Sequence, residues 1–230
     1  MRRLLVFVLS FSFLVFPVRA APLTRYVALT FDDGPSGKYT RALLDGLYDR
    51  GAKATFLLCG YRIQDYPDLA QRIFDEGHEI GLHGYSHDAM TGMSRRQIAR
   101  ELMDTESLLP EGCSPAFFRP PGGLVGDAVV QVAQARGLAI LHWSVDPQDW
   151  ELSDTAAIEK RVLQTVTDGD IILLHDMSTS SVQAALDIVD ALQKEDFEFV
   201  TVSELARLRG LRPKGGTVYQ KFPPRDQQVK

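Results

Sequence analysis

Short apolar segments alternate with amphipathic segments along most of the chain after residue 25. The apolar segments have the length of β-strands, and the amphipathic ones repeat their apolar residues at helical spacing. Ser94, a good N-cap, opens the third such helix. We expect strands at 26–31, 54–58, 79–82, 116–118, 138–143, 170–174 and 197–201. We expect helices at 38–50, 68–76, 94–109, 127–136, 154–166, 180–194 and 202–208.

This alternation predicts an α/β fold in which parallel strands are joined by right-handed crossovers through helices. A closed or nearly closed barrel of seven β–α units in a single domain, with the helices outside, is the simplest arrangement. A doubly wound open sheet is the alternative. We expect the domain to cover 21–210 and the residues that follow, 211–230, to form an extended or disordered tail, because they are polar and rich in proline and glycine.

The first twenty residues read as a signal peptide. Arg2 and Arg3 precede an apolar run at 4–16, and small residues stand three and one positions before Ala21, where we expect cleavage. An uncleaved membrane anchor is the alternative, although the run is shorter than the ~20 residues of a membrane span. We therefore expect a secreted or periplasmic protein with no stable membrane insertion after signal cleavage.

The net charge limits the possible partners, and the two cysteines permit one disulfide. Loss of Arg2, Arg3 and Arg19 with the leader would take the net charge from −5 to −8. A chain this acidic lacks the basic surface that nucleic acids require and has no attraction to anionic membranes. An oxidising compartment permits a disulfide between Cys59 and Cys113, but two separate thiols are equally consistent with the sequence.

Charged and imidazole side chains follow five of the expected strands. In sheets of parallel strands the carboxyl ends of the strands meet on one face, and functional sites are built there. The sequence therefore predicts one site that draws on all five strand ends. Its candidate residues are Asp32 and Asp33, His83 and His87, Arg119, Asp146 and Asp149, and His175.

His83 and His87 indicate a metal site. On a helical turn their spacing places both imidazoles on one face, and a strand-end carboxylate completes three ligands with a position open for water. Asp32 and Asp33 are adjacent on an extended backbone and point in different directions, so one can bind metal while the other faces substrate. Iron oxygenases also use two histidines and one carboxylate, but the additional acid, guanidinium and imidazole favour hydrolysis.

Taken together, five ordered motifs resemble those of the polysaccharide deacetylases, the NodB homology domain of the family-four carbohydrate esterases. The resemblance spans 25–208, and it implies a distorted (β/α) barrel and metal-dependent removal of N-acetyl groups from N-acetylhexosamine units of a glycan such as chitin oligomers or peptidoglycan. The motifs are Thr30–Gly34, His83–His87, Arg119–Gly123, Asp146–Trp150 and Leu173–His175.

The resemblance also implies a role for each motif residue. Asp32 would be the general base that deprotonates water bound to the metal, with Arg119 holding and tuning it. His175 would be the general acid, tuned by Asp149. The residues implied to bind a divalent metal, usually Zn²⁺, are Asp33, His83 and His87. Those implied to contact substrate are Gly122, through its N–H on the oxyanion, and Trp150 and Leu173, around the acetyl methyl group.

Two positions depart from the family pattern. Gly84 replaces a serine or threonine whose hydroxyl usually supports the loop, and Gly122 stands where many members have tyrosine.

Two other functions stay open. An O-acetyl glycan esterase, acting for example on acetylxylan, would use the same residues. A non-catalytic glycan-binding domain is the other alternative, but it should have lost a metal ligand or Asp32 or His175, and all are present.

Overall fold

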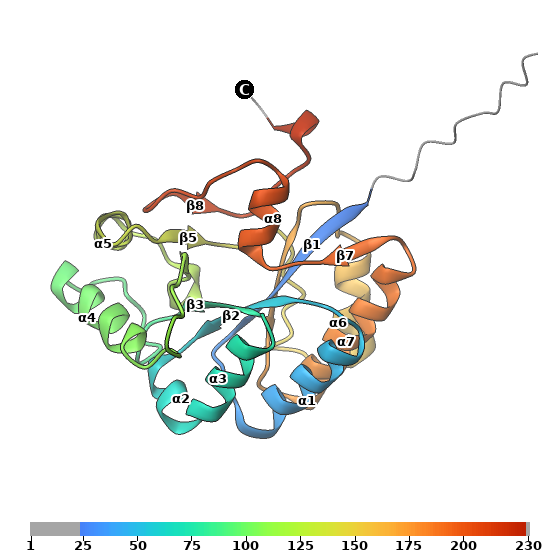
Figure 1. Ribbon diagram of the computed structural model, residues 1–230, viewed down its shortest axis with the longest axis horizontal. Helices are drawn as coiled ribbons and strands as arrows, with labels where there is room; N and C mark the ends of the chain where they lie inside the picture. Colours follow the sequence, from blue (N-terminus) through green and yellow to red (C-terminus); the bar gives the residue numbers. More distant parts are fainter. Residues whose placement is uncertain (1–23, 229–230) are drawn as a thin grey trace, which may run out of the picture.

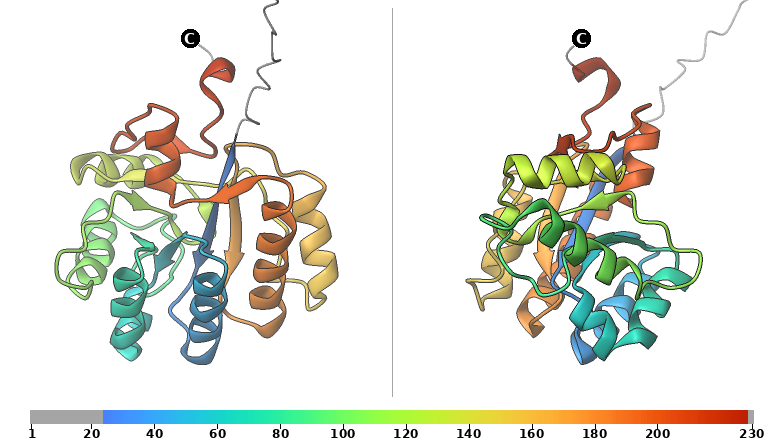
Figure 2. Two further views of the ribbon diagram at one scale, coloured as in Figure 1. Left: turned by 45° about the vertical axis from the view of Figure 1, so that its right-hand side comes forward. Right: turned by 90° about the vertical axis from the view of Figure 1, so that its left-hand side faces the viewer.

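The structure, a computed structural model, describes residues 24–228 and contains a curled, largely parallel sheet surrounded by helices (Figures 1 and 2). The expected signal peptide at 1–20 lies outside the described residues. The strands are β1 (Arg25–Asp32), β2 (Ala54–Leu58), β3 (Glu79–Leu82), β4 (Phe117–Phe118), β5 (Ala139–Leu141), β6 (Ile171–His175), β7 (Phe197–Phe199) and β8 (Val218–Tyr219). The helices are α1 (Gly37–Asp49), α2 (Gly60–Asp65), α3 (Pro67–Asp75), α4 (Arg95–Glu106), α5 (Asp127–Ala135), α6 (Thr155–Leu163), α7 (Thr179–Gln193) and α8 (Val202–Leu208), with short 3₁₀ turns at Pro121–Gly123 and Arg225–Gln227.

The strands pair in the order β6–β1–β2–β3–β4–β5–β8, and every pair is parallel. β7 pairs with the first residues of β1. Two isolated bridges, Val145 with Ile172 and Asp170 with Lys221, link the far end of the sheet back to β6. The predicted distorted barrel in a single domain is therefore confirmed, and the doubly wound open sheet is wrong.

The period-two alternation of the strands divides the core into an outer and an inner part. Outward residues of β1, such as Leu29 and Phe31, pack against α1, α3, α6 and α7. A second outer cluster joins the sheet to α4 and α5. Inward residues such as Ala28 and Phe117 instead pack with α8 and the buried Phe222, and α8 lies at the end of the sheet where β1 begins (Figure 1).

Residues 211–228 are anchored to the barrel at two points. This segment adds β8 beside β5, with Ile140 paired to Val218, and it buries the ring of Phe222 completely. The Pro/Gly-rich composition that suggested a loose tail belongs to turns between these anchored points. Residues 211–228 therefore contribute a strand and a core side chain to the domain, unlike the extended or disordered tail that we expected.

The structure confirms one further expectation about the helices and strands and differs from two others. Ser94 caps α4 as expected, in a capping box with Gln97. Helix α2 was not foreseen, and β5 is shorter than predicted.

Both thiols are free, with Cys59 buried and Cys113 half-buried against the outer core. The structure therefore has two separate cysteines and not the disulfide. Within residues 24–228, no helix combines the length and the apolar character needed to cross a bilayer.

Candidate active site

The inner face of the barrel delivers the charged side chains to one place. Asp32 lies two pleats beyond Ala28 on β1, and His175 lies two pleats beyond Ile171 on β6, so each continues an inward-facing row past the apolar core. The two strands run in register, with Asp32 paired to His175. Arg119 follows the inward-facing Phe117 in the same way. The strand-end convergence predicted from the sequence is what brings these side chains together.

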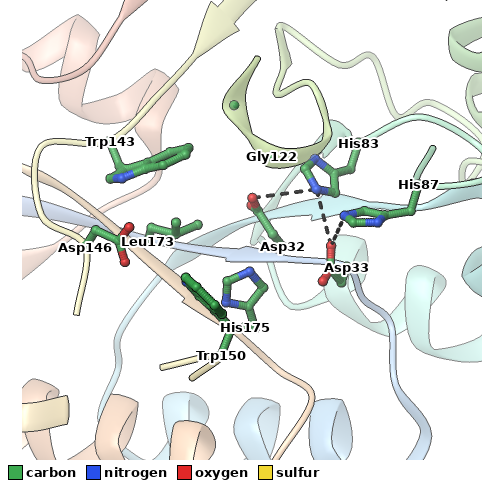
Figure 3. A pocket seen from close by; sticks show the side chains of 11 residues that line it. Asp32, Asp33, His83, His87, Gly122, Trp143, Asp146, Trp150, Leu173 and His175 are labelled. Carbon is green, nitrogen blue, oxygen red and sulfur yellow. Dashed lines mark ion pairs between the residues drawn. The ribbon is translucent and has the colours of Figure 1, made fainter. Parts of the chain in front are cut away.

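Asp33, His83 and His87 form a compact cluster of potential metal ligands. Oδ1 of Asp33 lies 3.2 Å from Nε2 of His83 and 3.0 Å from Nε2 of His87 (Figure 3). Ligand atoms around a tetrahedral zinc ion, with bonds of about 2.0–2.1 Å, stand about 3.3 Å apart. Moreover, Oδ1 of Asp33 is buried and accepts no hydrogen bond among the described residues. The spacing and the chemistry of the three residues therefore fit a divalent metal.

The backbone that presents these ligands differs from the helical turn we expected. Residues 83–87 form a bend, and His87 and Asp33 both have left-handed backbone conformations, with φ of 65° and 71°. The two imidazoles still converge, with ring centroids 5.1 Å apart. The helical-turn prediction is therefore wrong, and the bend brings the rings together by a different backbone path.

The charges of the cluster stabilise one another. Burial alone would raise the pKa of Asp33, but the two adjacent imidazoles hold that pKa far below its usual range. In turn, the Asp33 carboxylate raises the pKa of His87. His83 makes a further contact, because its Nδ1 lies 2.7 Å from the backbone oxygen of Arg119. A carbonyl can only accept, so Nδ1 of His83 donates to it, and Nε2 is the ring nitrogen that faces the cluster.

Asp32 is held by a buried arginine. The guanidinium of Arg119 donates to Oδ1 of Asp32 at 2.6 Å and to the hydroxyl of Thr30 at 2.9 Å. Its Nε–H donates to the backbone oxygen of Leu141, and Nη2 donates to that of His142. Arg119 is fully buried, and this set of acceptors compensates for its desolvation. Since Oδ1 of Asp32 is engaged, its other oxygen, 3.8 Å from Nε2 of His83, is the one that faces the ligand cluster.

Asp149 holds His175 through two contacts. Its carboxylate accepts from the backbone N–H of His175 at 2.8 Å, and it lies 2.8 Å from Nδ1 of the ring. An ionised carboxylate only accepts, so Nδ1 is the protonated nitrogen in this pair. Burial alone would lower the pKa of His175, but the hydrogen bond and charge of Asp149 outweigh it and raise the pKa to about 9. His175 therefore keeps both ring protons at neutral pH.

These groups open onto one cleft of about 470 Å³ (Figure 3). Every residue predicted to bind metal or substrate lines it, as do Asp32 and His175, whereas Arg119 and Asp149 lie behind them as buried partners. The lining consists of Asp32, Asp33, His83, His87, Gly122, Gly123, Trp143, Asp146, Trp150, Leu173 and His175.

Trp143 is a cleft residue that sequence reasoning missed. The sequence pattern places Trp143 at the end of a strand and gives it no role. In the structure its ring forms one wall of the cleft. The ring also lies against the Arg119 guanidinium, whose Cζ is 5.4 Å from the ring centroid. A Cβ on Gly123 would lie 2.7 Å from this ring, and Gly123 has φ of 69°. The second glycine of the Pro-Pro-Gly-Gly turn thus makes room for Trp143. The position of Trp143 at the end of the expected strand 138–143, shortly before the Asp146 motif, was the only available signal.

Comparison with known proteins agrees with this geometry. Residues 20–141 match the family model described as polysaccharide deacetylase, which is more than half of the chain. The chain belongs to the polysaccharide deacetylase family. A peptidoglycan-N-acetylglucosamine deacetylase of Bacillus cereus is 37% identical over 191 residues, which cover 80% of this chain and 90% of that protein.

Longer relatives match as well. A peptidoglycan-N-acetylglucosamine deacetylase of Listeria monocytogenes is 36% identical over 190 residues, 82% of this chain but only 40% of that protein. The chain thus spans less than half the length of this relative. Among solved structures, a family 4 acetyl xylan esterase of Clostridium thermocellum, in complex with a cobalt ion, superposes with a TM-score of 0.80 at 34% identity, covering 86% of this chain and all of the other.

Proposed function

We propose that this protein is a metal-dependent hydrolase that removes N-acetyl groups from N-acetylhexosamine units of a glycan, with chitin oligomers or peptidoglycan as substrates. The observation that carries this proposal is that one cleft contains a metal-ligand cluster together with a carboxylate, Asp32, and an imidazole, His175, each held by a buried partner. Hydrolysis of an amide needs a base to deprotonate water and an acid to protonate the amine that leaves. The family membership of the chain and the names of its relatives support the same reaction.

The metal would be held by Asp33, His83 and His87, and Zn²⁺ is the ion we propose, because two imidazoles and one carboxylate are a common ligand set of catalytic zinc. When bound, such an ion polarises the carbonyl and lowers the pKa of water towards ~7. The protein's own contribution is the fixed geometry of the three ligands.

Asp32 is the proposed base. Arg119 occupies Oδ1 and thereby fixes the carboxyl plane, so the second oxygen points to the ligand cluster and is free to take a proton from the attacking water. The side chain is almost fully buried, which keeps bulk water from competing for it. Removal of the Asp32 carboxylate charge should leave the three metal ligands in place and abolish proton transfer.

His175 is the proposed acid. Asp149 binds Nδ1–H, which leaves Nε2–H as the proton available to the cleft. With a pKa of about 9, the imidazolium is protonated at neutral pH and can donate to the departing nitrogen, which is too basic to leave as an anion. The register pairing of Asp32 with His175 places base and acid on neighbouring strands.

The walls of the cleft suit an acetylated sugar. Leu173 and Trp143 offer apolar surface for the acetyl methyl group. Gly122 has open space where a side chain would stand, so a developing oxyanion can approach its backbone N–H. Beyond Trp150, which is 63% exposed, lies a second hollow of about 430 Å³ whose lining includes Ser153 and several serines at the start of α7. An exposed aromatic face beside hydroxyl groups supports a glycan chain rather than a single sugar as the ligand.

A second candidate function is removal of O-acetyl groups from a glycan. The observation that favours it is the structural similarity to an acetyl xylan esterase, whose TM-score is 0.80. The same base and metal ligands would serve an ester, but an alcohol is a better leaving group than an amine. Dependence on His175 would therefore be weaker for ester than for amide substrates.

The proposal is tested by measuring acetate release from N-acetylglucosamine oligomers, peptidoglycan and acetylxylan with the zinc-loaded protein. Asp32→Asn should bind zinc as wild type does and lose about 10²–10⁴-fold in rate, whereas His83→Ala should lose zinc and activity together. Asp104→Asn, an exposed carboxylate on α4, is the matched control and should be fully active. Near-normal activity of Asp32→Asn would remove Asp32 from the base role, and release from acetylxylan alone would favour the esterase.

We also propose that the protein acts outside the cytoplasm, secreted or periplasmic, because 1–20 carry the pattern of a signal peptide. Its proposed partner is the N-acetylated glycan, and its acidic charge argues against nucleic acid. Cell fractionation with an antibody to the protein tests this directly. Recovery of the full-length chain in the cytosol would contradict it.

A further inference from the structure

The loop that carries the ligand His87 has an unfavourable backbone. Residues 84–87 include two left-handed conformations, with φ of 85° at Gly84 and 65° at His87. A non-glycine residue such as His87 adopts this conformation at a steric penalty, because its Cβ crowds a neighbouring backbone carbonyl. Other contacts must therefore hold the loop in the shape that directs His87 towards the cluster.

Hydrogen bonds from two helices supply these contacts. The carbonyls of Gly84 and Tyr85 accept from the first two N–H groups of α2, at 3.0 and 3.1 Å. The amides of Tyr85 and Ser86 both donate to a single oxygen, Oε2 of Glu101 on α4, each at 2.8 Å. The hydroxyl of Ser86 donates to the same oxygen at 3.0 Å. One carboxylate oxygen thus satisfies three donors of a loop whose other side is tied to α2.

His87 depends on this loop more than His83 does. His83 is 2% exposed, and its ring is fixed by the backbone oxygen of Arg119. The His87 side chain is 42% exposed, and among residues 24–228 its ring has no polar contact other than the one with Asp33. The position of its Nε2 therefore follows from the backbone that Glu101 holds.

The same carboxylate compensates for the unusual residue at position 84. The family pattern has a hydroxyl side chain there, but a Cβ on Gly84 would lie 3.0 Å from Cε of Met90 and 3.5 Å from Oε2 of Glu101. The space beside Gly84 is thus filled by Met90 and the Glu101 carboxylate. Support for the loop thus comes from Glu101 on α4, which lies on the side of Gly84 where a side chain would stand, and glycine is free to adopt the left-handed turn.

We propose that Glu101 is a positioning residue that sets the metal affinity of the Asp33–His83–His87 cluster by fixing the loop that carries His87. This inference rests on the metal site of the proposed function. Removal of the carboxylate would leave two half-buried backbone N–H groups and one hydroxyl without their acceptor. The loop would then relax from its left-handed shape, and His87 would spend less time within reach of the other two ligands.

The test is the zinc affinity of the purified, full chain, measured by competition with a chelator in the absence of any glycan. Glu101→Ala should bind zinc about 10- to 100-fold more weakly, the effect typical of a lost partner of a metal ligand. Glu101→Gln keeps an acceptor oxygen and should remain close to wild type. Ser86→Ala removes only the hydroxyl donor and should fall between them. Glu106→Ala, which removes a carboxylate from the end of the same helix, is the matched control.

A second readout separates positioning from folding. The zinc-free unfolding temperature of each variant shows whether the domain is intact. With saturating zinc, Glu101→Ala should recover most of its kcat at an unchanged KM for the glycan, whereas the zinc concentration for half-maximal activity should rise with the measured Kd.

Several results would overturn the inference. Wild-type zinc affinity in Glu101→Ala would do so, as would equal losses in Glu101→Ala and Glu101→Gln, because the proposal requires an acceptor and not a charge. A wild-type chain that binds no zinc would remove both this inference and the proposed metal site. A chain that binds zinc but releases no acetate would contradict the deacetylase alone, since the affinity comparison needs no substrate.

Discussion

Asp149 should determine the pH range in which His175 can act as an acid. Both contacts of this carboxylate with His175, to the backbone N–H and to Nδ1, are 2.8 Å long and charge-assisted. Asp149→Asn preserves the size of the side chain, removes its charge and replaces one acceptor by an NH₂ group. One of the two N–H groups of His175, the backbone amide or Nδ1–H, would then face this NH₂ group and lose its acceptor.

The size of the effect follows from the raised pKa of His175. A pKa of about 9 instead of 6.5 means that the folded protein favours the protonated ring by about 3 kcal/mol. Without the Asp149 charge, the effect of burial is no longer outweighed, and the pKa should fall by about 2 units. Because the acid must be protonated, activity is lost as the pH rises through the pKa, so the alkaline limit of kcat/KM should move down by the same amount.

The assay is kcat/KM for N-acetylglucosamine oligomers between pH 5.5 and 10.5, with the His175 ring titration followed by NMR in the zinc-loaded protein. Asp190→Asn is a suitable control, since it removes an ion-paired carboxylate of α7 that does not line the cleft. An alkaline limit at the same pH in wild type and in a folded Asp149→Asn variant would refute the reasoning, because His175 would then not be the titrating acid.

Three further predictions concern the fold. His78 is buried with its Nδ1 accepting from the Ala54 amide, and burial lowers its pKa to about 4; since the unfolded chain binds the proton more readily, up to about 3 kcal/mol of stability present above pH 6.5 should be lost as the pH falls to 4, and urea unfolding of His78→Asn should show a flatter pH dependence. Phe222→Ala should cost about 3–5 kcal/mol in urea unfolding, because the ring is completely buried, and a cost below 1 kcal/mol would mean that the chain after α8 is not part of the core. Gly123→Ala should displace the Trp143 ring, lowering both the unfolding temperature and kcat/KM, and unchanged values of both would contradict the tight packing.

The sequence predicted the site better than it predicted local backbone. Asp32, His83, Arg119 and His175 could be placed because each ends a short apolar strand, and parallel strands deliver their carboxyl ends to one face whatever the loop details. The helical turn expected for 83–87 was wrong, since spacing alone does not distinguish a helix from a bend stabilised by another element. That stabilising contact, from Glu101, belongs to α4 and left no trace in the motif.

What the sequence by itself determined is the alternation of strands and helices from β1 to α8, apart from α2, and the residue types that make up the site, because both follow from periodicity and from residue types at strand ends. Tertiary structure alone decided which distant side chains complete that site. Trp143 walls the cleft only because the barrel curls it over Arg119, and Phe222 closes the inner core only because β8 pairs with β5. Such contacts join residues far apart in the chain, and their free energy exists only once the sheet has curved and brought those residues together.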